Sequence, residues 1–182
     1  EELYPYIFKN NSVMATLGNA MRELNYYGTE QVSCFIRNIF CAIANDPMVQ
    51  GYLCDALLVI RDEEQGIQIV NALCQYIETN DVVCDTLGEA MRTLDYYGTA
   101  GISNVIRDIF CGMARNERIQ WHLCKALLRT KSSTQGIKIV CVLAPYRRKN
   151  QVITNTFIEA SRSLNYMETR EVSELIQLLL TR

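Results

Sequence analysis

Cysteine is the residue type with the greatest potential for covalent chemistry in this chain, because eight cysteines occur in 182 residues. An even number of cysteines is typical of a disulfide framework, and disulfides form in oxidising compartments. Buried thiols are the other interpretation, since free cysteine is among the most buried residue types. A metal site has little support, because the chain has one histidine and no CxxC pair. The eight residues are Cys34, Cys41, Cys54, Cys74, Cys84, Cys111, Cys124 and Cys141.

An internal repeat provides a comparison for these cysteines. Residues 10–79 align without gaps on residues 80–149 at an offset of 70, and 33 of the 70 positions are identical. Residues 157–176 resemble the start of the unit once more, at weaker identity. Repeats of this kind are typical of stacked structural units. The predicted organisation is a leader (1–9), repeat 1 (10–79), repeat 2 (80–149) and a half repeat 3 that caps the C-terminal side (150–182).

Two cysteine pairs recur in both full repeats. Cys41 and Cys54 correspond to Cys111 and Cys124. One member precedes a predicted helix–helix loop and the other follows it, so an antiparallel hairpin brings them within bridging reach. Repeat 3 has Thr181 at the first position and ends before the second. This joint loss predicts the disulfides Cys41–Cys54 and Cys111–Cys124.

Cys74 and Cys84 flank the junction between the two full repeats, and both are replaced at the next junction. They are the third predicted bridge. Cys34 and Cys141 have no local partner, so they are candidates for a distant pair, a bond to another chain, or free thiols. A disulfide framework predicts a secreted, extracellular protein, and the sequon that begins at Asn10 is compatible with secretion.

The elements that carry these residues are predicted to be helices. Apolar residues recur at helical spacing through each unit, and no segment alternates with period two. Each 70-residue unit therefore contains four helices of about 14–17 residues with short loops, stacked as hairpins around a continuous core. Asp46, Asp62 and Thr29 are predicted N-caps, and Gly28 and Gly98 are predicted left-handed C-caps. The fold class is all-α, and the leader is expected to cover the first hairpin.

Charge separates along a chain whose net charge is only −2. Residues 45–79 carry six acidic residues and one arginine, whereas the equivalent residues 115–149 carry nine basic residues and one glutamate. Drift of solvated faces explains this, and so does head-to-tail association of acidic and basic faces. An anionic partner such as a glycan is a third interpretation, and nucleic acid is disfavoured by the pI of about 5.5. The basic candidates for protein binding are Arg118, Lys125, Arg129, Arg147 and Arg148.

Tyrosine pairs at the loop edges are further candidates for protein binding. Tyr26 and Tyr27 recur as Tyr96 and Tyr97. A tyrosine joins an apolar ring to a hydrogen-bonding hydroxyl, which suits an interface. The alternative is that one tyrosine of each pair packs across a helix end.

No sequence motif for catalysis or cofactor binding stands out, so we expect a non-enzymatic protein without cofactor or metal that acts by protein binding or self-assembly. One alternative is a carrier of an apolar ligand. Another is an intracellular helical-repeat scaffold with reduced cysteines. No apolar run is long enough to predict a membrane span. The carrier would line its cavity with Phe35, Ile39, Phe40, Val105 and Phe110.

Overall fold

A computed structural model describes residues 6–7, 9–24, 28–96, 98–164 and 166–181. This described part is all-α, with ten α-helices and no strand. The chain divides into two compact units, residues 1–105 (unit 1) and 106–182 (unit 2). The division falls inside a helix and not at either predicted repeat boundary, which remain predictions from the sequence.

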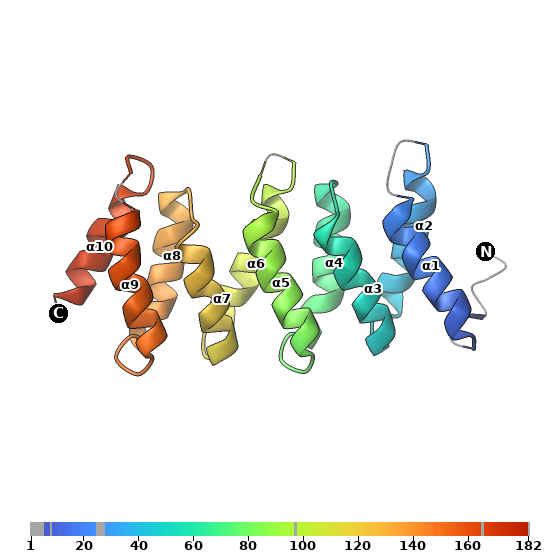
Figure 1. The fold of residues 1–182 in the computed structure, drawn as a ribbon, viewed down its shortest axis with the longest axis horizontal. Helices are drawn as coiled ribbons and strands as arrows, with labels where there is room; N and C mark the ends of the chain where they lie inside the picture. Colours follow the sequence, from blue (N-terminus) through green and yellow to red (C-terminus); the bar gives the residue numbers. More distant parts are fainter. Residues whose placement is uncertain (1–5, 8, 25–27, 97, 165, 182) are drawn as a thin grey trace. The chain divides into compact units, whose positions relative to one another are not determined.

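Unit 1 consists of helices in two layers. In Figure 1, α1, α3 and α5 lie in front, and α2 and α4 lie behind them. Contacts join α1 to α3, α3 to α5 and α2 to α4, and the two layers meet where α1 packs on α2 and α3 packs on α4. The helices are α1 (Asn11–Glu23), α2 (Glu30–Ala42), α3 (Pro47–Leu58), α4 (Glu63–Leu73), the 3-10 helix η2 (Cys74–Tyr76), α5 (Asp81–Thr93) and α6 (Ala100–Gly112), which crosses into unit 2.

Unit 2 has the same two-layer arrangement, with α7 and α9 in front of α8 and α10 (Figure 1). Contacts join α7 to α9 and α8 to α10 along the layers, and α7 to α8 and α9 to α10 between them. Each helix of this set begins 70 residues after an earlier helix begins, and each ends within two residues of the same offset. The helices are α7 (Glu117–Leu127), α8 (Ser133–Leu143), the 3-10 helix η3 (Ala144–Tyr146), α9 (Gln151–Ser163) and α10 (Arg170–Leu180).

In the described residues, four α-helices lie within residues 11–73 and four within residues 81–143, the number expected, but the predicted lengths are wrong. The helices have 11–13 residues, and the loops are correspondingly longer. α4 ends at Leu73, and the chain tightens into η2 before the next helix. Gly28 and Gly98 have φ of 93° and 91°, in the left-handed region as predicted. They lie within the loop, because α1 already ends at Glu23 with Leu24 as its C-cap.

Two of the three predicted N-caps are confirmed. The Asp46 carboxylate accepts the N–H of Met48 at 2.8 Å, and the Asp62 carboxylate accepts the N–H of Gln65 at 2.8 Å. Thr29 occupies the N-cap position of α2 but makes no side-chain cap bond. Its hydroxyl donates instead to the carbonyl of Leu24 at 2.8 Å, which satisfies an open carbonyl at the end of α1.

Buried polar side chains make the same bonds at each equivalent position. A buried serine links α1 to α2, and its equivalents link α5 to α6 and α9 to α10. In each case the serine hydroxyl donates to a backbone carbonyl twelve residues earlier. A buried glutamine stabilises the loop before α3, and another stabilises the loop before α7. Each side chain donates to a backbone carbonyl six residues earlier. These bonds make the interior of the fold periodic. The serines are Ser33, Ser103 and Ser173, and the glutamines are Gln50 and Gln120.

Apolar side chains form the core of each unit. Phe40, Phe110 and Phe157 are fully buried. Ile7 is also buried, whereas Tyr6 beside it is exposed, so the described part of the leader contributes one core side chain. Gly66 lies against the Ile102 side chain so closely that any Cβ there would displace it.

Candidate protein-binding surfaces

The predicted disulfides Cys41–Cys54 and Cys111–Cys124 are not present, and no disulfide occurs in the described residues, which include all eight cysteines. The reason is the rotation of the helices. Cys41 faces α4, where its thiol approaches the Gln68 carbonyl at 4.0 Å, whereas the Cys54 side chain hydrogen-bonds Thr86 on α5.

The same geometry recurs in unit 2. Cys111 interacts electrostatically with Lys138 on α8, and the Cys124 side chain hydrogen-bonds Thr156 on α9. The two members of each predicted pair therefore lie in different helix–helix interfaces. The sequence spacing placed the two cysteines of each pair on the same helical hairpin. It did not specify which neighbouring helix each side chain contacts.

The Cys74–Cys84 bridge is also not formed. The Cys74 thiol donates to the carbonyl of Asn71 at 3.2 Å, in the last turn of the preceding helix α4, while Cys84 is buried within α5. Cys34 is half-buried and Cys141 is exposed.

The thiols that face helix interfaces are poorly ionised. Burial raises the pKa of Cys41, Cys54 and Cys111 to about 11. Because the thiolate is the reactive form, these cysteines have low reactivity and act as packing residues. The interpretation as small buried groups therefore describes them better than the interpretation as bridges.

The tyrosine pairs are only partly described. Tyr26, Tyr27 and Tyr97 lie outside the described residues. Tyr96 is half exposed, and Tyr166, its equivalent in repeat 3, is more exposed still. These two rings are accessible to a partner, as an adhesive role requires.

The predicted basic residues gather in unit 2. Lys125, Arg129 and Arg148 are exposed, and Arg118 and Arg147 are half-buried. The compact units sharpen the charge separation predicted from the sequence. Unit 1 has five basic and fourteen acidic residues, a net charge of −9, whereas unit 2 has thirteen basic and six acidic residues, a net charge of +7.

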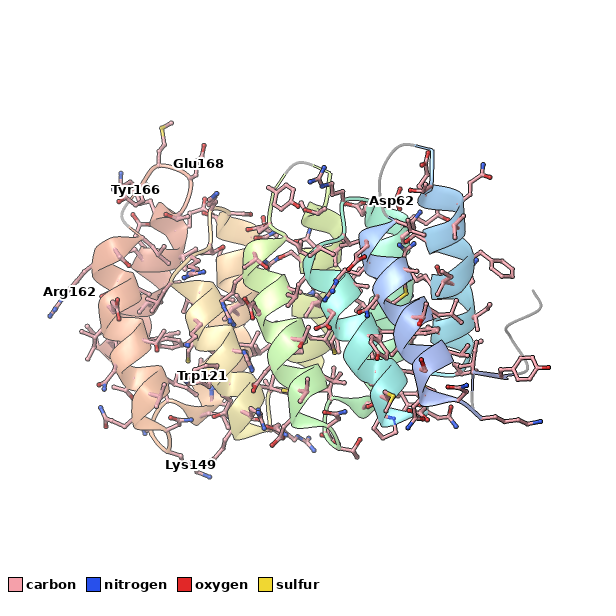
Figure 2. The ribbon with its side chains drawn as sticks, turned by 45° about the vertical axis from the view of Figure 1, so that its right-hand side comes forward. Asp62, Trp121, Lys149, Arg162, Tyr166 and Glu168 are labelled. Atoms are coloured by element: carbon pink, nitrogen blue, oxygen red, sulfur yellow. The ribbon has the colours of Figure 1, made fainter. Side chains whose placement is uncertain are left out.

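A hollow of about 430 Å³ lies beside Lys149, between α7 and the start of α9. Trp121 forms one wall and is 42% exposed, and the Lys125 ammonium stands 3.6 Å from the centre of its ring. Figure 2 shows Trp121 and Lys149 toward the same end of unit 2, away from Tyr166. The lining residues are Glu117, Trp121, Lys149, Asn150, Gln151 and Val152.

An acidic stripe on α5 is the corresponding feature of unit 1. Asp81, Asp85 and Glu89 follow each other at four-residue spacing, and all are exposed. Val82 stands beside them and is 60% exposed. The equivalent residues of α1 are Asn11, Ala15 and Asn19, and those of α9 are Gln151, Asn155 and Glu159.

The sequence prediction did not identify the hollow or the stripe as sites. The signal was available in the alignment of the repeats, because Trp121 stands where repeat 1 has Gly51 and Lys125 stands where it has Asp55. What the sequence did not show is that Trp121 is exposed and lies beside the loop that carries Lys149.

A second hollow, of about 610 Å³, lies on the opposite layer of unit 1 and is lined by acidic and amide side chains such as Asp62, Glu64 and Gln68. Arg37 is buried nearby on α2, where its guanidinium donates to Gln65 and to the Ser33 hydroxyl. Burial lowers the pKa of Arg37. These bonds give Arg37 a structural role between α2 and α4.

None of the residues predicted to line an apolar cavity lines any of the three described hollows. Phe40 and Phe110 are fully buried core residues, whereas Phe35 is about half exposed on α2. Their arrangement is that of packed helices and one surface ring.

Asn10 of the predicted sequon has a structural explanation. Its side chain caps α1 by accepting the N–H of Ser12 at 2.9 Å. Asn80 and Asn150 cap α5 and α9 in the same way, at positions where no sequon exists. The asparagine at this position is thus explained by capping.

No family model matches the chain, and neither a curated protein nor a solved structure matches it. In the described ranges, acidic, histidine and cysteine side chains do not gather in threes that could hold a metal ion. None of the described helices combines the length and apolarity that crossing a bilayer requires.

Proposed function

We propose that this chain is a non-enzymatic helical-repeat protein, stacked as two and a half repeats around a continuous core, that works by binding protein. The first partner we propose is a second molecule of the same chain. The acidic surface of unit 1 would meet the basic surface of unit 2 of the next molecule, in a head-to-tail contact.

One observation carries this proposal: units built on the same helix pattern have net charges of −9 and +7. Complementary charge accelerates encounter and sets orientation between partners. A molecule with one acidic and one basic unit is complementary to itself.

The interior supports a binding role over a catalytic one. The buried polar groups Ser33, Gln50 and Thr99 donate to backbone carbonyls and so hold helix ends and loops in place. The charge differs between equivalent positions on the exposed surface, where most of the acidic and basic residues and Trp121 lie. A stable framework with a varied surface is the arrangement that a binding protein needs.

Sedimentation velocity over a range of concentrations tests the proposal. At low salt we expect the mean sedimentation coefficient to rise with concentration, and at about 0.5 M salt we expect a monomer, because screening shortens the reach of exposed charges. A monomer at every concentration and at both salt levels would contradict self-association.

The cysteine geometry favours a second candidate for the setting in which the protein works. Cys41 and Cys54 face different helices and have raised pKa values, as expected of an intracellular repeat scaffold with reduced thiols. Non-reducing peptide mapping of protein from its natural source tests this. Native disulfides at these positions would instead support the extracellular location.

A further inference from the structure

An exposed apolar face lies on α9 and α10 of unit 2. This α9–α10 face is defined by Ile158, Leu178 and Leu180, whose side chains are between 36% and 50% exposed. A hollow of about 480 Å³ lies beside Ile158, and all the residues that line it belong to α9. Figure 2 shows another of these residues, Arg162, projecting from α9 away from the other helices of unit 2. The face is therefore open in the part of unit 2 that the structure describes.

In unit 1 the equivalent face is covered by α3 and α4. Its residues are Gly18, Asn38 and Phe40. The Tyr52 ring of α3 lies so close to Gly18 that a Cβ there would collide with it, and the same ring lies beside the buried Phe40. Asn38 accepts a hydrogen bond from the Gln68 amide of α4. The fold thus places the next pair of helices on this face.

The α9–α10 face is more apolar than its covered counterpart at two positions. Ile158 stands where unit 1 has Gly18, and Leu178 stands where it has Asn38. An end of a helical stack that meets only water needs a polar outer surface. Larger apolar side chains at exposed positions instead indicate contact with a second protein surface.

In the layer of α1, α3 and α5, the sixth residue after the N-cap faces the preceding helix. On α3 this residue is Tyr52, which lies against α1. On α5 it is Thr86, whose side chain hydrogen-bonds Cys54 on α3. On α1 it is Thr16, which is exposed. Thr16 therefore marks the surface on which a preceding helix would pack.

In the layer of α2 and α4, the third and sixth residues after the N-cap face the preceding helix. On α4 these are Gln65 and Gln68, which hydrogen-bond side chains of α2. On α10 the third is Val172, which is fully buried against α8. On α2 they are Val32 and Phe35, which are 49% and 46% exposed. Together with the exposed threonine of α1, these two residues define the α1–α2 face.

The two faces are complementary if α1 and α2 of another molecule take the places that α3 and α4 have in unit 1. Thr16 then stands opposite Ile158, a small side chain against a large one, whereas unit 1 has a large ring against Gly18. Phe35 stands opposite Leu178 as an apolar pair, whereas unit 1 has an amide pair there. Both exchanges preserve a matched contact.

We infer that the α9–α10 face of one molecule packs on the α1–α2 face of a second molecule, with Ile158 against Thr16 and Leu178 against Phe35. This inference rests on the proposed self-association and names its surfaces. The first face belongs to the unit of net charge +7 and the second to the unit of −9, so charge favours this pairing over contact between two copies of unit 2. Such heterologous contacts extend into chains or close into rings.

A charge exchange tests the pair of Leu178 and Phe35. Leu178→Asp and Phe35→Lys each place a charge against an apolar side chain, so each single variant should self-associate at least about tenfold more weakly at low salt. The double variant has the residue types of the Asp108–Lys138 ion pair at equivalent positions, and it should recover most of the lost association. Sedimentation velocity measures association, and circular dichroism with thermal unfolding verifies that each variant is folded.

A size exchange tests the pair of Ile158 and Thr16 independently. Thr16→Tyr introduces a ring that collides with Ile158 of the neighbouring molecule, so association should weaken at least about tenfold. Adding Ile158→Gly gives the pair the residue types of Gly18 and Tyr52 in unit 1, and the association should recover. The same sedimentation measurement applies.

A matched control makes the same charge changes elsewhere, with Val82→Lys on unit 1 and Val152→Asp on unit 2. These valines are 60% and 48% exposed and lie outside both faces. The control should associate like the unaltered protein.

The outcomes separate the inference from the proposal on which it rests. If the unaltered protein associates and the single variants associate as strongly as the control, the contact lies elsewhere and the inference is wrong. It is also wrong if a double variant is no stronger than its single variants. If the unaltered protein is monomeric at both salt levels, the proposed self-association itself is wrong. Recovery in both double variants supports the inference.

Discussion

Two equivalent places in the molecule join their helices with different chemistry. On unit 1 the Gln68 amide donates to the Asn38 side chain at 2.8 Å, which links α4 to α2. On unit 2 the Lys138 ammonium donates to the Asp108 carboxylate at 2.6 Å at the equivalent positions. The backbone arrangement is shared, but a neutral pair in one unit is an ion pair in the other.

Buried positions show the opposite behaviour. Gln50 donates to the Ala44 carbonyl and accepts from Asn80, and Gln120 makes the same two bonds with Ala114 and Asn150. A buried polar group without a partner is costly, whereas an exposed pair has water as an alternative. The comparison shows that buried hydrogen bonds have to be kept in both units. Exposed positions do not have this constraint, so they can carry acidic side chains on one unit and basic side chains on the other.

Core truncation should give the largest effect and should be equal in the two units. Phe40→Ala and Phe110→Ala each remove a fully buried ring, and each should lower the free energy of unfolding by about 3–5 kcal/mol. Leu180→Ala, at the equivalent and partly exposed position of α10, should cost under about 1.5 kcal/mol. Urea denaturation measures all three. A similar cost at all three positions would contradict the comparison.

Thiol reactivity should distinguish the cysteines that face helix interfaces from an exposed cysteine. With a pKa of about 11, Cys41 and Cys111 should react with iodoacetamide at pH 8 about 100-fold more slowly than an ordinary thiol, in proportion to their thiolate fraction. Exposed Cys141 is the internal control. Timed alkylation with peptide mass spectrometry gives the rates.

The same pKa shifts set a dependence of stability on pH. The folded thiols hold their protons to higher pH than the unfolded thiols, whose ordinary pKa is 9.0. Stability from this source is therefore complete below pH 9 and is lost as the pH rises toward 11. Urea denaturation at pH 8 and pH 10.5 should show lower stability at the higher pH. The substitutions Cys41→Ser and Cys111→Ser should reduce this difference in stability between the two pH values.

Loss of the buried glutamine should have a smaller effect than core truncation, again equal in the two units. Gln50→Ala and Gln120→Ala each leave a buried carbonyl and an N-cap asparagine without their partner, at a cost of about 1–3 kcal/mol. Urea denaturation of the two variants side by side tests this. A large difference between them would show that the two interiors are not equivalent.

Exchange of the exposed pairs should have the smallest effect and should break the symmetry between the units. Asp108→Asn with Lys138→Gln gives unit 2 the pair of unit 1. Stability should change little, but its dependence on salt should decrease, because an exposed ion pair is screened and an amide pair is not. The control is Asn38→Asp with Gln68→Lys, which should increase the dependence. Thermal unfolding at two salt concentrations measures both.

The sequence by itself determined the local structure of this protein. The helices, their number in each 70-residue unit and the caps at Asp46 and Asp62 follow from periodicity and from hydrogen bonds between residues two or three apart. These interactions depend only on near neighbours, so a one-dimensional pattern contains them.

Only the tertiary structure decided which helix each side chain faces. Successive residues of an α-helix are rotated by about 100°, so the direction of Cys41 or Cys54 depends on how the helices pack, and the predicted bridges were wrong for this reason. The hollow at Trp121 likewise depends on α7 and the loop before α9 coming together. Charge counts were readable from the sequence, but the division into units of −9 and +7 required the contacts of the folded chain.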